Sequence, residues 1–208
     1  MALIHRTTLK PTKVELLAGW LPTRPWYRGS AAPELVKAGG FRLDDPAGEV
    51  GIEFMVVTEE SGAYLVPLTY RAAPLEGADH ALVGTMEHGV LGTRWTYDGC
   101  HDPVLTAGLL ALIEGRAQAQ AQSLTDTPDH EVARGYEGEG PLPGLGAPVD
   151  TDESTEFAVP DTGLVLELRR VLTPGSTPPE DAVGHVTGVW EHSANTRTRA
   201  LFAGLRPR

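Results

Sequence analysis

The chain offers seven histidines, one cysteine and 28 acidic residues, the side chains from which metal sites and nucleophilic centres are built. Their densest cluster is the run YDGCHD, which contains Asp98, Cys100, His101 and Asp102. Zinc needs three or four ligands that converge on one point, whereas side chains adjacent in sequence cannot all point at one ion. Asp102 followed by Pro103 is instead the pattern that begins a helix. We therefore expect no metal site in this run.

Other combinations that would support catalysis are incomplete. Cys100 has no family signature of a nucleophile around it, and no serine lies in a G-x-S-x-G motif. The glycine-rich run GEGPLPGLGAP lacks the lysine of a phosphate-binding loop and is interrupted by Pro141 and Pro143. His185 and His192 stand seven residues apart, so in a strand they face opposite sides. We expect no catalytic residue, cofactor site or metal site.

Two tryptophans, a tyrosine and two arginines crowd the run GWLPTRPWYRG, in a chain that is otherwise poor in aromatic residues. The candidate binding surface consists of Trp20, Arg24, Trp26, Tyr27 and Arg28. The rings could fill the core where a helix meets a sheet, with the arginines stacked on them. Alternatively, the prolines of the run could rigidify an exposed aromatic loop that contacts a sugar or a partner protein.

Composition narrows the function classes. The net charge of −11 argues against nucleic acid and anionic membrane surfaces as partners. A single cysteine excludes an intramolecular disulfide. The sequence has no apolar run of about 20 residues, as a membrane span needs, and no apolar region of a signal peptide follows the N-terminal basic residues. We expect a cytoplasmic protein, and its 14 arginines against three lysines fit a bacterial gene of high GC content.

Periodicity predicts an α+β fold. An edge strand over 2–10 and a short helix over 14–21 precede a hairpin over 50–71, in which Pro67 marks an edge strand or a bulge. A second hairpin over 80–99 follows, and then one long helix over 102–122 whose polar end projects into solvent. Consecutive hairpins favour a curved antiparallel sheet packed on the long helix and the short N-terminal helix.

The second half of the chain changes in character. Residues 123–152 are acidic and dense in glycine and proline, which is typical of a linker or a long loop. Residues 153–208 begin with a hairpin around PDTG and continue with the strands AVGHVTGVWEH and TRALFAGL, a small C-terminal antiparallel β unit. The expected organisation is therefore a domain over 1–122, a linker over 123–152 and a β unit over 153–208.

The order of three runs resembles the N-terminal cap domain of actinobacterial maltokinases. These are WLPTRPWYRG, the hairpin VGIEFMVVTEESGAYLVPLTYR and the turn into the helix TYDGCHDPVLTAGLLALI, and the resemblance covers about residues 3–122. In that family the cap sits on the N-lobe of an aminoglycoside-phosphotransferase-like kinase. The kinase transfers phosphate from ATP to maltose and feeds glycogen and trehalose-linked α-glucan metabolism.

The chain departs from the kinase pattern in its second half. The run STEFAVPDTGLVLELRRVL resembles the first N-lobe strands, but Leu166 or Glu167 stands where the kinase needs its ATP-phosphate lysine, and no lysine follows Lys37. At 208 residues the chain is also too short for cap, N-lobe and C-lobe together. The resemblance therefore implies a stand-alone cap with a vestigial β unit, which is not a functional kinase on its own.

Three functions remain open at this point. The first is a non-catalytic interaction or regulatory module that docks on a kinase or another enzyme of α-glucan, trehalose or maltose-phosphate metabolism. The second is a carbohydrate-binding or small-molecule-binding module that uses an aromatic surface. The third is an enzyme with an unrecognised site, and only scattered histidines and acidic residues support this interpretation.

Overall fold

The computed structural model describes residues 9–122, 124, 127–193 and 196–208, and these residues form two α-helices and fourteen strands. Within them every strand pairing is antiparallel, as the consecutive hairpins predicted. The strand order is β1-β5-β6-β4-β3-β2-β13-β14-β11-β10-β9, and β7, β8 and β12 pair with β2, β13 and β4 beside this path. The fold is α+β and mostly β.

The elements alternate along the chain as follows. The helices are α1 (Lys13–Trp20) and α2 (Pro103–Ile113), with 3-10 helices η1 (Leu21–Thr23), η2 (Asp79–Ala81) and η3 (Gly99–His101). The strands are β1 (Leu9–Lys10), β2 (Val36–Leu43), β3 (Gly51–Glu59), β4 (Gly62–Arg71), β5 (Leu82–His88), β6 (Gly92–Asp98), β7 (Gln120–Ala121), β8 (Ala133–Tyr136), β9 (Pro148–Asp150), β10 (Ser154–Val159), β11 (Leu164–Arg169), β12 (Val171–Leu172), β13 (Gly184–Ser193) and β14 (Thr196–Pro207). The edge strand predicted over 2–10 is present as β1, paired with β5, while its residues 2–8 lie outside the described residues.

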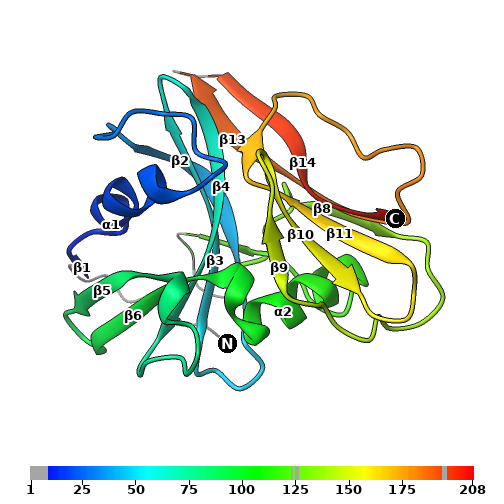
Figure 1. Cartoon of the computed structure of the whole chain (residues 1–208), viewed down its shortest axis with the longest axis horizontal. Helices are drawn as coiled ribbons and strands as arrows, with labels where there is room; N and C mark the ends of the chain where they lie inside the picture. Colours follow the sequence, from blue (N-terminus) through cyan, green and yellow to red (C-terminus); the bar gives the residue numbers. More distant parts are fainter. Residues whose placement is uncertain (1–8, 123, 125–126, 194–195) are drawn as a thin grey trace.

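In the first half of the chain, α1 and the run of residues 19–29, which we call the aromatic segment, pack onto one face of β3 and β4 (Figure 1). The helix begins with a capping box in which Thr12 and Glu15 each accept a hydrogen bond from the other's backbone N–H. The helix predicted over 14–21 is thereby confirmed. The buried side chains of this face are Leu17, Trp20, Leu21, Trp26, Met55, Val57, Tyr64, Val66 and Leu68.

The two hairpins predicted in this half are present as β3–β4 and β5–β6, but the prediction for Pro67 is wrong. The strand β4 lies between β3 and β6, and Pro67 stands opposite Phe54 in a regular register. On the other side of β4, the pairing with β12 reaches Tyr64 and the pairing with β6 begins at Leu68. Pro67 therefore faces the gap between two partner strands, where its missing N–H breaks no ladder hydrogen bond.

The helix α2 begins as predicted but ends earlier. Asp102 is the N-cap, its carboxylate accepts a hydrogen bond from the Val104 N–H, and Pro103 is the first helical residue. The helix ends at Ile113 instead of continuing to residue 122, because Gly115 takes a left-handed conformation with φ of 78° that stops it. The predicted polar helical tail is therefore wrong, and part of it forms β7, which pairs with β2.

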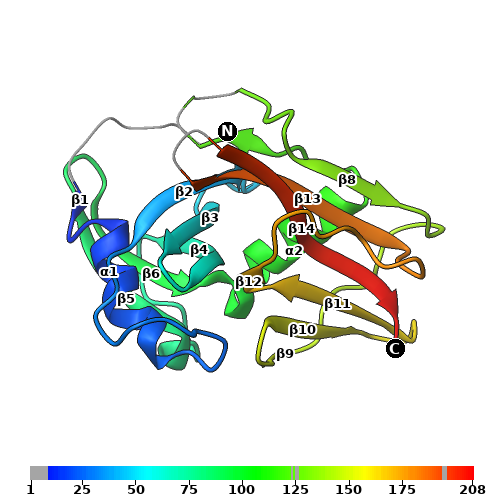
Figure 2. The same cartoon turned by 90° about the horizontal axis from the view of Figure 1, so that it is seen from above.

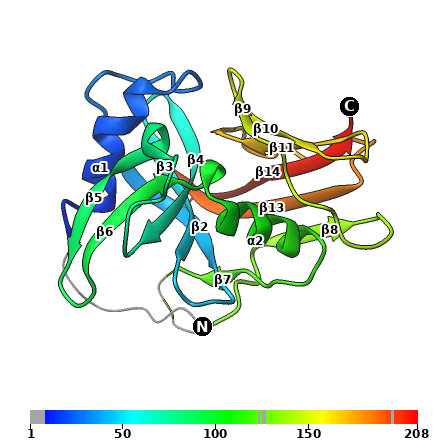
Figure 3. The same ribbon diagram turned by 60° about the horizontal axis from the view of Figure 1, so that its bottom comes forward.

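The two halves of the chain share a hydrophobic core. The strands β2 and β13 pair at Gly39 and Trp190, which joins the sheet of the first half to that of the second. Behind this junction Phe41 stacks on Phe54 at 4.5 Å between ring centroids and on Phe202 of β14 at 6.3 Å. The helix α2 runs alongside β13 and contributes to the same core (Figure 2; Figure 3).

The segment 123–152, predicted as a linker or long loop, contains two short strands. The strand β8 pairs with β13, and β9 pairs with β10 at the end of the sheet order. The side chains of Leu142 and Leu145 pack against the shared core. Residues 123, 125 and 126 of this segment lie outside the described residues.

Candidate functional site

The two tryptophans of the candidate binding surface lie inside the fold. Trp26 is fully buried and Trp20 is 6% exposed, and their rings meet edge to face at 5.9 Å. Trp26 also contacts the Tyr64 ring at 6.3 Å. Neither indole N–H has a hydrogen-bond partner among the described residues. These rings serve the core between α1 and the sheet, as one of the two interpretations of the sequence expected.

The other three residues of this candidate surface lie nearer to solvent. The Arg24 guanidinium stacks over the Trp20 ring at 4.8 Å. Tyr27 is half-buried and its hydroxyl donates a hydrogen bond of 2.6 Å to Glu59, and burial together with this acceptor raises the pKa of Tyr27. Arg28 is exposed, and its Nη2 donates to Glu153 at 3.0 Å. Arg28 thus joins the first half of the chain to the second through an ion pair.

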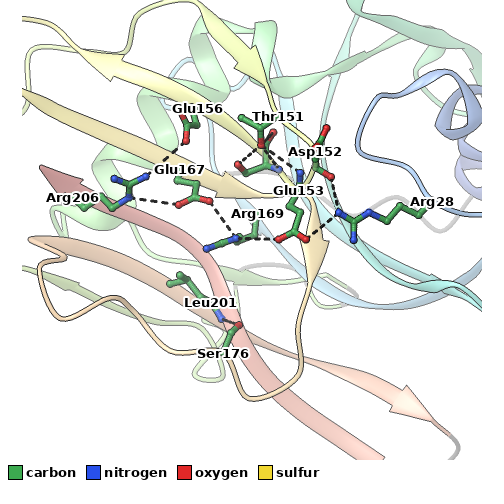
Figure 4. A network of polar contacts seen from close by, with 11 residues as sticks. Arg28, Thr151, Asp152, Glu153, Glu156, Glu167, Arg169, Ser176, Leu201 and Arg206 are labelled. Atoms are coloured by element: carbon green, nitrogen blue, oxygen red, sulfur yellow. Dashed lines mark hydrogen bonds and ion pairs between the residues drawn. The ribbon is translucent and has the colours of Figure 1, made fainter. Parts of the chain in front are cut away.

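Arg28 begins a row of alternating charges that continues through Glu153 onto the outer face of β10, β11 and β14 (Figure 4). We call this row the charge strip, and it consists of Arg28, Glu153, Arg169, Glu167, Arg206 and Glu156. Arg169 Nη1 lies 3.8 Å from Glu153 Oε2 and 3.3 Å from Glu167 Oε1. Arg206 lies 3.8 Å from Glu167 and 3.9 Å from Glu156.

Strand alternation places these charges on one face. In β11, Leu166 and Leu168 point into the core and Glu167 and Arg169 point outward. Glu156 stands directly opposite Glu167 in the β10–β11 ladder, an arrangement of like charges that destabilises a sheet when nothing compensates it. The arginine ion pairs of the charge strip supply that compensation.

The neighbouring residue Arg170 has the opposite environment. It is fully buried, its Nη2 contacts both carboxylate oxygens of Asp98 at 2.9 and 2.6 Å, and its Nε donates to Thr155 at 2.7 Å. Its guanidinium lies over the Trp26 ring at 4.9 Å. Burial alone would lower the pKa of Arg170, but the Asp98 carboxylate has the opposite effect and the net result is a raised pKa. Nothing in the sequence distinguished Arg170 from Arg169, and the structure makes it the link between β6, β10 and the aromatic segment.

A second buried charge lies on β3. The Glu53 carboxylate receives the ammonium groups of Lys13 and Lys37, the Tyr70 hydroxyl at 2.6 Å and the Gln122 amide at 3.1 Å. Burial would raise the pKa of Glu53, but the two lysines and the hydrogen bonds from Lys13 and Tyr70 lower it to about 2. Two of the three lysines of the chain are thus committed to one carboxylate.

The side chains of the YDGCHD run separate to different partners. Asp98 binds Arg170, and Asp102 binds Arg71 through two hydrogen bonds of 2.7 Å while capping α2. Cys100 is buried, and burial raises the pKa of its thiol well above the ordinary value, which removes the thiolate that nucleophilic attack requires. In the described part of the chain, no group of three or more histidine, cysteine or acidic side chains could hold a metal ion.

One member of this run meets a partner that sequence reasoning missed. The His101 Nδ1 atom lies 3.1 Å from Nε2 of His80, which is 21 residues earlier. Both residues line an open cavity of about 410 Å³, which residues 145–148, just before and at the start of β9, also line. The contact depends on the turn through η2 and on the start of α2, and no spacing in the sequence indicates it.

The side chains at the two positions compared with the kinase lysine both have structural roles in this fold. Leu166 is fully buried in the shared core, and Glu167 belongs to the charge strip.

None of the helices in the ranges described above combines the length and the apolar character needed to cross a bilayer.

The comparison with known families is consistent with this arrangement. Among curated proteins none matches the chain. One family model, described as Maltokinase N-terminal cap domain, matches residues 20–102, which is less than half of the chain. The match begins at the last residue of α1, includes the aromatic segment and β2 to β6, and ends at the N-cap of α2. This part of the chain therefore matches the Maltokinase N-terminal cap domain and is similar to that family.

Proposed function

We propose that the chain is a non-catalytic interaction module that docks on a kinase or another enzyme of α-glucan metabolism in the cytoplasm. The observation that carries this proposal is the match of residues 20–102 to the cap family. In maltokinases the cap sits on a kinase lobe. In this chain the strand that resembles the kinase lysine strand has Leu166 in the core and Glu167 in ion pairs, which supports a role without phosphate transfer.

We place the docking face on the charge strip. Its six side chains alternate in sign, four of them on β10, β11 and β14, and an alternating pattern favours a partner with the complementary pattern over other partners. Exposed ion pairs of this kind contribute only about 0–1 kcal/mol each to folding. They can therefore exchange partners on binding at small cost to the fold.

The experiment measures binding of the purified chain to a purified maltokinase and to other purified enzymes of α-glucan metabolism from the same organism by biolayer interferometry. We expect one of them to bind, and Arg169→Glu to weaken that binding by at least tenfold. The control is Arg197→Glu, because Arg197 forms an exposed ion pair with Glu131 and uses no residue of the charge strip. Absence of binding to every enzyme, or equal binding by the two variants, contradicts the proposal.

A second candidate function is the binding of a sugar or another small molecule. The cavity of about 410 Å³ favours it, because ligand pockets commonly have volumes of about 300–1,000 Å³. The buried positions of Trp20 and Trp26 weigh against these rings as the platform. Under this alternative maltose, trehalose or a malto-oligosaccharide raises the melting temperature of the chain, and a Thr106→Trp substitution at the cavity wall abolishes the rise.

A further inference from the structure

The contact between His80 and His101 has the geometry of two ligands of one ion. Two nitrogens that each lie about 2.0–2.1 Å from one tetrahedral zinc ion stand about 3.3 Å apart. The observed separation of His80 Nε2 and His101 Nδ1 is 3.1 Å. Both rings present a nitrogen that binds metals in proteins, since zinc accepts either imidazole nitrogen.

The distance between the two ring centroids is compatible with this geometry. A straight N–H···N hydrogen bond of this length would place the two ring centroids about 5.4 Å apart. The observed centroid distance is 4.7 Å with planes at 87°, so the rings are bent rather than aligned end to end. If both rings tilt equally to one side, their lone pairs meet about 2.2 Å from each nitrogen, close to the length of a zinc–imidazole bond.

The surroundings leave room for the rest of a coordination sphere. The pair borders the open cavity of about 410 Å³, so waters or a small ligand can occupy the remaining positions. His80 is exposed and His101 is half-buried. Burial lowers the pKa of His101 from its ordinary value, and the nearby His80 and Arg170 act in the same sense against Asp98 and Asp150.

From this geometry we propose that His80 and His101 form a two-histidine site for a divalent transition-metal ion of the class that prefers imidazole, such as Zn²⁺, Ni²⁺ or Cu²⁺. His80 binds through Nε2 and His101 through Nδ1, and each ring carries its proton on the other nitrogen. Water or a small ligand in the cavity completes the coordination. This site is independent of the proposed docking function, because it uses none of the residues of the charge strip.

The test is a calorimetric titration of the tag-free chain, freed of metal by a chelator, with Zn²⁺ and with Ni²⁺ at pH 7.5. We expect one ion to bind per chain, and Mg²⁺, which prefers oxygen ligands, to give no signal. The variants His80→Asn and His101→Asn each reduce the affinity at least tenfold. Titration at pH 5.5 also weakens binding, because protonated imidazole is not a ligand.

The matched control is His192→Asn, which removes an exposed histidine of β13 and leaves the affinity unchanged. Circular dichroism of every variant verifies that the fold persists, and the substitution of a single exposed ring in His80→Asn leaves the core intact. No binding of Zn²⁺ or Ni²⁺ by the wild-type chain overturns the proposal. Binding that His80→Asn and His101→Asn leave unaltered overturns it equally, and shows that the two rings form a hydrogen bond only.

Discussion

At the scale of single residues, the neighbours Arg169 and Arg170 show how position decides the energetics of a charge. Arg169 extends over the outer face of β11 and contacts two exposed or half-buried glutamates. Arg170 is fully buried and binds Asp98 while covering the Trp26 ring. A buried charge that loses its partner remains desolvated without compensation, whereas an exposed charge is solvated by water.

We predict that Arg170→Ala lowers the free energy of unfolding by about 3–5 kcal/mol, because it leaves the Asp98 carboxylate buried and unpaired. Arg169→Ala is the matched control and lowers it by less than about 1 kcal/mol. Guanidinium unfolding at pH 7 measures both. If Arg170→Ala yields no folded protein, Arg170→Lys supplies the measurement, since it keeps the charge and loses the planar fork. Equal destabilisation by both alanine variants would show that the buried pair has no special role.

At the scale of elements, Gly108 and Gly115 have opposite effects on the helix α2. Gly108 lies within the helix, and an added Cβ would meet Leu43 Cδ1 at 3.4 Å and Ile52 Cδ1 at 3.6 Å, which are ordinary contacts. Gly115 follows the helix with φ of 78°, and an added Cβ would come within 2.2 Å of the Arg134 guanidinium. The first glycine weakens the helix and the second one ends it.

We therefore predict effects of opposite sign for the same substitution. Gly108→Ala raises the free energy of unfolding by about 0.5–1 kcal/mol, the usual advantage of alanine over glycine inside a helix. Gly115→Ala lowers it by about 1–2 kcal/mol, because the left-handed conformation is strained for any residue with a Cβ. Thermal unfolding of the two variants beside the wild type tests the pair. A stabilising Gly115→Ala would mean that α2 can extend toward residue 122 after all.

At the scale of the whole molecule, the buried carboxylate of Glu53 makes stability depend on pH. The pKa of Glu53 falls from the ordinary 4.5 to about 2 in the folded chain. A lowered pKa means that the folded state is stabilised at pH values above about 4.5 and loses this contribution as the pH falls toward about 2. The shift corresponds to roughly 3 kcal/mol.

We predict that Glu53→Gln is less stable than the wild type at pH 7 and that the difference between them shrinks between pH 4.5 and pH 2. Urea unfolding at a series of pH values measures this difference. Glu156→Gln serves as the control, because Glu156 is 38% exposed and its partner Arg206 lies 3.9 Å away. A difference between Glu53→Gln and wild type that stays constant with pH would show that folding does not lower the pKa of Glu53.

The sequence by itself determined the features that depend on neighbours along the chain. Asp102 and Pro103 predicted the start of α2, because an N-cap and a first-turn proline act within one turn. Strand-prone runs on either side of turn residues predicted the hairpins of β3–β4, β5–β6 and β10–β11, because strand propensity and turn chemistry act locally. The cap resemblance also came from runs of adjacent residues, and the family match over 20–102 supports it.

Only the tertiary structure decided which distant side chains meet. Asp98 and Arg170 are 72 residues apart, and Glu53 meets a lysine 40 residues before it. Pro67 is tolerated in an inner strand only because two different partners, β12 and β6, leave a gap beside it. These contacts follow from the order of strands in the sheet, which is set by the burial of the whole apolar surface at once. Local patterns carry no information about that order. The buried ion pairs, the charge strip and the histidine pair could therefore not be predicted from the sequence.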